Sequence, residues 1–282
     1  MALEVIIKRE IRDTVLSRRF IIYLILLIFP VVVNIWFSWI MYKSPSILEQ
    51  MTAMFPEPLT EVNPMICLMS FIDITTFPIA LVAVIHGSDF IAGERERGML
   101  TLLISKPLNR WEIILGKLFS FLVIFLPLLI LSYFIMGLSL ILIGIGAANV
   151  NILLGYLTVI LSYALVYTSI AMLFSVLSKK SSMASLGAII FLILWMILDF
   201  LTIYLPKGIT NFLNNISLSY HINNVLGFIS AGEAGLFVKG GIASNPTSGE
   251  FIYSLSVITI VLIIIPILIS VCVFQRKDIQ NR

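Results

Sequence analysis

Charged residues are scarce in this sequence: Asp, Glu, Lys and Arg make up 12% of its 282 residues, whereas 60% are hydrophobic. Soluble domains carry about 25% charged residues, so this composition excludes an ordinary soluble protein. The mean hydropathy is +1.08. The apolar runs are far longer than the roughly 10-residue alternating strands of an outer-membrane barrel. The sequence therefore predicts an all-α integral membrane protein.

Cysteine is also scarce. Cys67 and Cys272 lie in different apolar runs, so neither a disulfide framework nor a zinc pattern is present. The sequence of Met65, Cys67 and Met69 suggests a copper(I) site, because thioether and thiolate ligands suit this ion. On a helix, however, Cys67 points away from the face that the two methionines share, so packing is the favoured interpretation. The sequence predicts no metal site.

Several catalytic and binding motifs are absent. Gly116-Lys117 is followed by Leu118 inside an expected helix, so the chain has no phosphate-binding loop of the form G-x-x-x-x-G-K-[ST]. His86 and His221 are isolated histidines expected on opposite membrane sides, and no nucleophile, base and metal set favours an intramembrane hydrolase. The net charge of +3 gives no footprint for nucleic acid. We expect no catalytic residue and no cofactor on this chain.

Long apolar runs dominate what is present. Crossing the hydrocarbon takes about 20 apolar residues. Six runs meet this length, and four of them contain a proline whose freed carbonyl a neighbouring helix can satisfy. The predicted spans are Phe20–Tyr42, Met65–His86, Leu118–Ile143, Ile152–Leu177, Met183–Leu205 and Phe251–Phe274.

Basic residues predict the orientation of these spans. Fifteen lysines and arginines fall on one side, and only Lys43, Lys207 and Lys239 fall on the other. Because cytoplasmic loops are enriched in Lys and Arg, both termini are expected in the cytoplasm of a cell-membrane protein. We expect a single transmembrane domain over residues 1–282.

Two flanking segments are expected to lie along the membrane rather than cross it. Residues Ala2 to Arg19 have apolar side chains at four-residue spacing and charges opposite, which predicts an interfacial helix. A charged lead-in to the first span is the alternative. On the outer side, residues 206–250 have helical spacing from Ile209 to Ile216, which predicts two short re-entrant or interfacial helices before a turn at Asn245-Pro246. A disordered loop is the alternative.

The most unusual stretch is the charged segment 88–109, between the second and third spans. Ser88 or Asp89 is expected to cap a helix that runs to Ser105, with Glu94, Arg95, Glu96 and Arg97 facing the cytoplasm and Leu100 holding the helix in place. Pro107 breaks this helix. Asn109, with Glu112 three residues on, begins the next one by a capping box. Helix, break and helix suit a rigid lever; an ordinary solvated loop is the alternative.

This segment resembles the intracellular loop of type-two ABC exporter permeases, including the stand-alone permeases that mature the copper site of nitrous oxide reductase. The whole layout of six spans with an N-terminal amphipathic helix is similar too. Met99 departs from the Thr usual in the family. The matching positions are Glu94, Glu96, Gly98, Leu100, Leu103, Ser105, Pro107, Arg110, Ile113, Leu115, Gly116 and Lys117.

The resemblance implies a coupling helix that seats in a separate ATPase subunit, where ATP and Mg bind. The implied contact consists of Glu94, Arg95, Glu96, Arg97, Gly98 and Leu100, and the implied lever break of Pro107, Asn109 and Arg110. Mixed charges give orientation-specific pairing with such a partner. Because six spans are few for a substrate pathway, a second or homologous permease copy is expected. Membrane lipid and an extracytoplasmic accessory protein are further expected partners.

Asp73 and Asp199 are the acidic residues inside the predicted spans. Intramembrane carboxylates indicate function by default, so both are candidates for a pathway or proton site. Hydrogen bonding to Thr75, Thr202 or tyrosines is the alternative. Asp73 or Asp199 would serve the alternative function of a proton-coupled secondary carrier. A non-transporting membrane scaffold is a further alternative. The substrate is not legible in the sequence.

Overall fold

A computed structural model describes residues 2–52, 62–100, 109–201, 205–229 and 246–276, and every regular element in these ranges is helical. Six helices are long and apolar enough to cross a membrane, which confirms the predicted spans. They are α2 (Arg18–Lys43), α4 (Pro64–Asp89), α7 (Arg110–Ile143), α8 (Val150–Leu177), α9 (Ser181–Leu201) and the continuous α12 (Ser248–Ser256), η1 (Val257–Ile264) and α13 (Ile265–Arg276).

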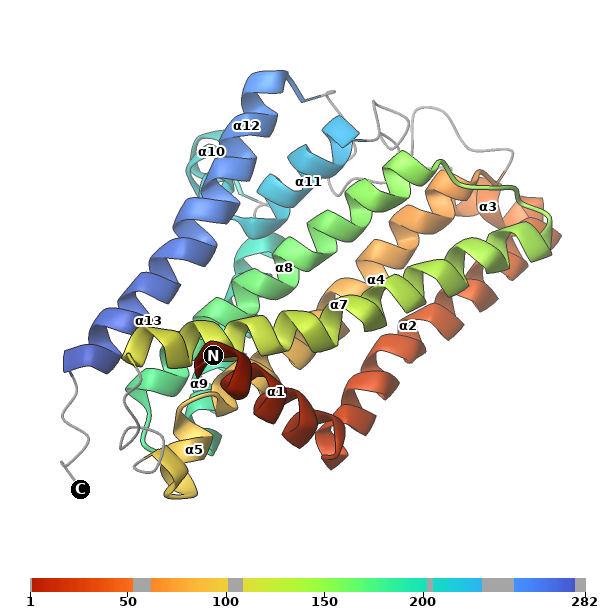
Figure 1. Ribbon diagram of the computed structural model, residues 1–282. Coiled ribbons are helices and arrows are strands. Elements are labelled where there is room, and N and C mark those ends of the chain that lie inside the picture. Colours follow the sequence, from red (N-terminus) through yellow and green to blue (C-terminus); the bar gives the residue numbers. More distant parts are fainter. Residues whose placement is uncertain (1, 53–61, 101–108, 202–204, 230–245, 277–282) are drawn as a thin grey trace.

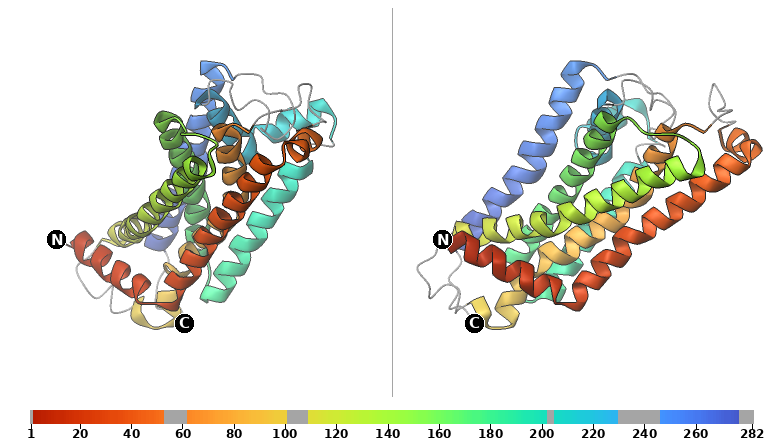
Figure 2. Two further views of the ribbon diagram at one scale, coloured as in Figure 1. Left: turned by 90° about the vertical axis from the view of Figure 1, so that its right-hand side faces the viewer. Right: turned by 45° about the vertical axis from the view of Figure 1, so that its right-hand side comes forward.

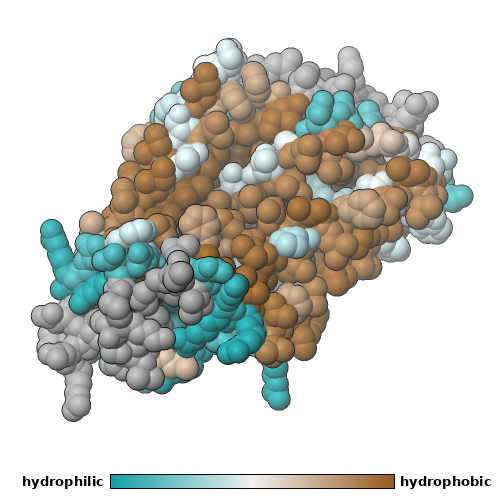
Figure 3. Space-filling model, in the orientation of Figure 1, coloured by the Kyte–Doolittle hydropathy of each residue, from teal (hydrophilic) through white to brown (hydrophobic). Residues whose placement is uncertain are grey.

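Helices α4 and α8 pack along each other at the centre of the bundle and are the most buried of the six (Figure 1). Helices α2, α7, α9 and the last span surround them. The surrounding helices expose large apolar side chains such as Phe134, Leu142 and Leu186, and most of the face in Figure 3 is hydrophobic. A surface of this kind is suited to lipid rather than water.

Polar and charged residues gather at one end of the bundle, which we call the basic end. It consists of the first turns of α2, α7 and α9, the last turns of α4, α8 and α13, and helices α1 (Ala2–Val15) and α5 (Ala92–Glu96). Figure 2 shows α1 and α5 at this end in both views. Most of the hydrophilic surface visible in Figure 3 lies at this end.

Helix α1 confirms the prediction of a helix at the N-terminus, but it ends at Val15 rather than at Arg19. Ser17 interrupts the helical conformation: its backbone is extended, and its hydroxyl donates to the carbonyl of Thr14 at 2.7 Å. Such a bond offers the backbone an alternative to the helical pattern. The break turns α1 across the ends of the spans and against α7 (Figure 1).

The last span contains the π-helical segment η1. Pro266 follows it and has no N–H, so a carbonyl of the preceding turn lacks its helical donor. The hydroxyl of the buried Ser169 on α8 donates to the carbonyl of Leu262 in that turn at 3.0 Å. A neighbouring helix thus supplies a donor to the backbone of the last span beside Pro266.

The opposite end confirms two short helices before the last span, α10 (Lys207–Asn214) and α11 (Leu218–Ile229). Thr247 and Glu250 form a capping box that begins α12. Helix α3 (Pro45–Thr52) was not predicted from the sequence. The glycines at 240 and 241 and Asn245 lie outside the described residues.

Candidate functional site

The charged segment forms a projection from the basic end. Helix α5 ends at Glu96, the chain turns at Arg97 and Gly98, and the next helical residues begin at Met99. Gly98 has a φ of 70°, a left-handed conformation that glycine adopts without steric strain. Glu96, Arg97, Gly98 and Met99 are exposed, whereas Leu100 is buried and holds the base of the turn.

The prediction of one continuous helix from Ser88 to Ser105 is wrong. Helix α4 runs through Ser88 to Asp89, and α5 begins only at Ala92. The cap of α5 comes from a different helix. The hydroxyl of Ser175 on α8 accepts hydrogen bonds from the backbone N–H groups of Ile91 and Ala92, both at 2.9 Å. No local pattern in the sequence indicates this contact.

From the sequence we expected Glu94 to face the cytoplasm. The structure contradicts this, because Glu94 is buried, with an exposed fraction of 2%. Its carboxylate lies 3.0 Å from the ammonium of Lys117 on α7, and that ammonium also contacts Glu10 of α1 at 2.6 Å. Lys117 is buried too. A buried ammonium requires compensating charge, and α1 and α5 both supply it, so Glu94 points inward.

Burial and Lys117 act in opposite directions on these two carboxyls. Burial raises the pKa of Glu94, and the attraction of Lys117 offsets this only in part, so that the pKa stays above its ordinary value. Burial also acts to raise the pKa of Glu10, but the charge and hydrogen bond of Lys117 outweigh it and the pKa is lowered. The two carboxyls that share Lys117 are therefore shifted in opposite directions, with the pKa of Glu10 lowered and that of Glu94 raised.

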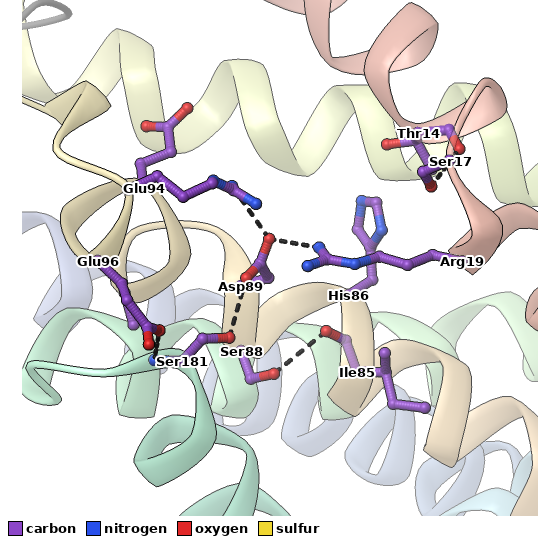
Figure 4. Close-up of polar contacts among 12 residues, drawn as sticks. Thr14, Ser17, Arg19, Ile85, His86, Ser88, Asp89, Glu94, Glu96 and Ser181 are labelled. Atoms are coloured by element: carbon purple, nitrogen blue, oxygen red, sulfur yellow. Dashed lines mark hydrogen bonds and ion pairs between the residues drawn. The ribbon is translucent and has the colours of Figure 1, made fainter.

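Asp89, at the end of α4, is the centre of a second ionic cluster (Figure 4). Its carboxylate pairs with Arg19 of α2, lies 3.2 Å from Arg97 beyond α5, and accepts a hydrogen bond from the Ser181 hydroxyl of α9 at 2.9 Å. The cluster thus joins three spans, α2, α4 and α9, to the projecting turn. The sequence analysis named Asp89 only as a possible helix cap and missed this role.

The turn between α8 and α9 binds the outer part of α5. Arg95 donates to the carbonyl of Ser178. The backbone N–H of Ser181 donates to Glu96 at 3.0 Å. With the Ser175 cap, these contacts fasten α5 to the basic end of α8 and α9, and the exposed residues Glu96 to Met99 form its tip.

The lever break is described only in part, because Pro107 lies outside the described residues. The capping box of Asn109 and Glu112 is confirmed, with the backbone N–H of Asn109 donating to the Glu112 carboxylate at 3.1 Å. Arg110 donates to the carbonyls of Phe274 and Gln275 at 2.8 and 2.7 Å. It therefore binds the end of α13 and connects the start of α7 to the last span.

A polar cavity of about 340 Å³ lies between α1, α2, α4, α5 and α7. His86 lies inside it, with Nδ1 2.9 Å from the hydroxyl of Tyr23. His86 Nε2 and Glu94 Oε2 are buried and have no hydrogen-bond partner in the described part of the chain. The cavity is lined by Arg9, Glu10, Asp13, Thr14, Ser17, Arg19, His86, Asp89, Phe90, Glu94, Arg97, Met99 and Lys117.

The two candidate acidic residues lie away from this end. Asp73 is exposed on α4. Asp199 on α9 accepts hydrogen bonds from the hydroxyls of Ser217 and Ser219, both at 2.6 Å, at the start of α11. Asp199 therefore holds α11 against α9, through partners that the sequence analysis did not name. A pathway or proton role for either residue stays a prediction.

No curated protein matches this chain. A family model does match: residues 4–279 fit the model described as "ABC-2 family transporter protein". The match covers α1, all six spans and the projecting segment, in agreement with the resemblance found in the sequence. The chain belongs to the ABC-2 transporter family, as a membrane permease subunit of an ABC transporter.

Proposed function

We propose that this permease is the membrane half of an ATP-driven exporter whose separate ATPase subunits bind ATP and Mg. The ATPase contacts the tip formed by Glu96, Arg97, Gly98 and Met99, which faces the cytoplasm together with both termini. One observation carries this proposal. Helix α5 projects beyond the spans with an exposed, mixed-charge tip, while its inner face is fastened to three other helices, α7, α8 and α9.

These attachments give the movement two routes into the membrane. Ser175, Ser178 and Ser181 connect α5 to α8 and α9, and Glu94 connects it through Lys117 to α7 and α1. Motion of the tip therefore reaches α8 and α9 directly, besides passing through the predicted lever break into α7. The sequence analysis anticipated only the route into α7.

The transport path itself is proposed to lie between two copies of the permease, or between this chain and a homologous one. ATP binding closes the ATPase dimer, moves both tips and reorients the spans toward the outer side of the cell membrane. Asp73 and Asp199 belong to the opposite end and are the candidate polar positions along that path. An extracytoplasmic accessory protein would meet the permease there.

The test is copurification of the permease with the ATPase encoded beside it. The variant Glu96→Arg with Arg97→Glu exchanges two exposed charges at the tip without altering net charge. It should weaken ATPase association by about tenfold, equivalent to about 1.4 kcal/mol.

The matched control exchanges charges elsewhere at the basic end. Glu4 and Lys8 of α1 form an exposed ion pair at 2.8 Å, and the variant Glu4→Arg with Lys8→Glu should bind the ATPase as the wild type does. Thermal unfolding must show that both variants are folded. Equal ATPase association and stimulation for the tip variant and the control would overturn the coupling role.

A further inference from the structure

We propose that the polar cavity at the basic end binds the headgroup of a phospholipid that bears a primary amine. In such a headgroup a phosphate and an ammonium group are two carbons apart. The ligand is a regulatory or structural lipid of the leaflet at the basic end, and its binding requires neither ATP nor the ATPase subunit.

The charges that line the cavity favour a ligand of both signs. Four cationic residues and four acidic residues line it, so their formal charges cancel with His86 neutral. A purely anionic ligand would gain nothing from the net charge of this lining, whereas a zwitterion can pair with both kinds of group. The cationic residues are Arg9, Arg19, Arg97 and Lys117, and the acidic ones are Glu10, Asp13, Asp89 and Glu94.

The rim of the cavity offers donors for a phosphate. Arg9 and Arg97 have side chains 35% and 50% exposed. Arg9 contacts Asp13 at 3.5 Å and the weak acceptor sulfur of Met99 at 3.5 Å, and Arg97 contacts Asp89 at 3.2 Å. Since a guanidinium has five N–H groups, both arginines keep donors for phosphate oxygens.

The inner part of the cavity offers acceptors for an ammonium. Glu94 uses Oε1 for Lys117, and its Oε2 has no partner in the described part of the chain. The Asp13 carboxylate, half exposed, lies at the rim beside Arg9. A primary ammonium has three N–H donors and can serve such carboxylates, whereas a trimethylated amine has none.

The position of the cavity fits a lipid with its chains in the membrane. Arg19 begins the first span, and His86 and Asp89 end the second, so the cavity lies where a span passes from hydrocarbon to headgroups. Ile22, Leu26 and Phe29 follow Arg19 on one face of α2, and Ile22 and Phe29 are exposed. An acyl chain on this face continues directly from a headgroup in the cavity.

The test compares purified permease in nanodiscs of phosphatidylcholine with and without phosphatidylethanolamine, by thermal unfolding and by native mass spectrometry. We expect a higher unfolding midpoint with phosphatidylethanolamine and about tenfold preferential retention of that lipid, equivalent to about 1.4 kcal/mol. Soluble phosphoethanolamine added to phosphatidylcholine nanodiscs separates a free ligand from a lipid: stabilisation by the soluble compound alone would overturn the assignment to a lipid.

Two single-charge variants of α1 separate the cavity from general effects of the bilayer. Arg9→Gln removes a lining charge, and Arg12→Gln removes a charge that is 74% exposed and does not line the cavity. The lipid preference should be lost in Arg9→Gln and kept in Arg12→Gln. Equal preference in the two variants, or none in the wild type, would overturn the proposal. Neither residue belongs to the tip, so ATPase association reports separately on the coupling role.

Discussion

The two ends of the helix bundle are held together by different chemistry. At the basic end, ion pairs join residues far apart in sequence: Lys117 with Glu10 and Glu94, and Asp89 with Arg19. At the opposite end, hydroxyl and amide groups predominate, with Asp199 bound by two serines and Ser254 by the His221 ring.

This difference relates to what each end can do. Buried ion pairs are destabilised strongly when one partner is removed or changes protonation, whereas single neutral hydrogen bonds contribute about 1 kcal/mol. On the proposals made above, the basic end responds to a partner, to pH and to a lipid headgroup. The opposite end is suited to keep α11 on α9 while the basic end changes.

The largest effect is expected from Lys117→Met, which leaves Glu10 and Glu94 facing each other without their cation. Removing one partner of a buried pair costs about 3–5 kcal/mol. The unfolding midpoint in detergent should fall steeply. Lys180→Met, at an exposed lysine of the same end, should change stability by less than about 0.5 kcal/mol. Equal midpoints for the two variants would show that the buried cluster contributes nothing to stability.

A smaller loss is expected from Asp199→Asn at the opposite end. The amide still accepts one hydroxyl but loses the charge that strengthens both bonds, so about 1–2 kcal/mol of stability is expected to be lost. Ser219→Ala, which removes one donor, should lose about 1 kcal/mol. Unfolding midpoints measure both. Abolished transport by Asp199→Asn with unchanged stability would instead support the proton-site hypothesis.

The spans and their ends were predictable because their signals are local. Apolar windows longer than the hydrocarbon thickness identified all six spans, and Asn109 with Glu112 identified the start of α7 within a few residues. The two short helices of the outer segment followed from apolar spacing alone. The resemblance to a known family supplied the predicted role of the charged segment.

The side-chain partners at the basic end were not predictable in the same way. Glu94 and Glu96 look alike in the sequence, yet one is buried on Lys117 and the other is exposed on the turn. The distinction depends on α7, whose Lys117 lies 23 residues further along the chain. One signal was available in the sequence. Lys117 lies two turns after the capped start of α7, so it is deeper in the helix bundle than a lysine of an ordinary basic loop. At that depth its ammonium requires a counter-charge.

The smallest of the expected effects concerns the pH dependence of the basic end. Since the pKa of Glu94 is raised in the folded protein, its contribution to stability is complete below the ordinary glutamate range and is lost as the pH rises through the raised value. The Glu10 contribution has the opposite sign, because its pKa is lowered: it is present above the ordinary range and is lost only in more acidic solution. The other charged or titratable groups around Glu94 are Arg9, Asp13, Arg19, His86, Asp89 and Arg97.

Glu94→Gln replaces this carboxyl by a permanently neutral group of the same shape. Its unfolding midpoint should therefore match the wild type near pH 4 and exceed it by a few degrees, about 2–4 °C per kcal/mol, near pH 8. Glu96→Gln on the exposed tip should follow the wild-type curve at both values. A Glu94→Gln curve parallel to that of the wild type would mean that Glu94 stays ionised beside Lys117, and the pH response of the basic end would then belong to His86 or Asp89.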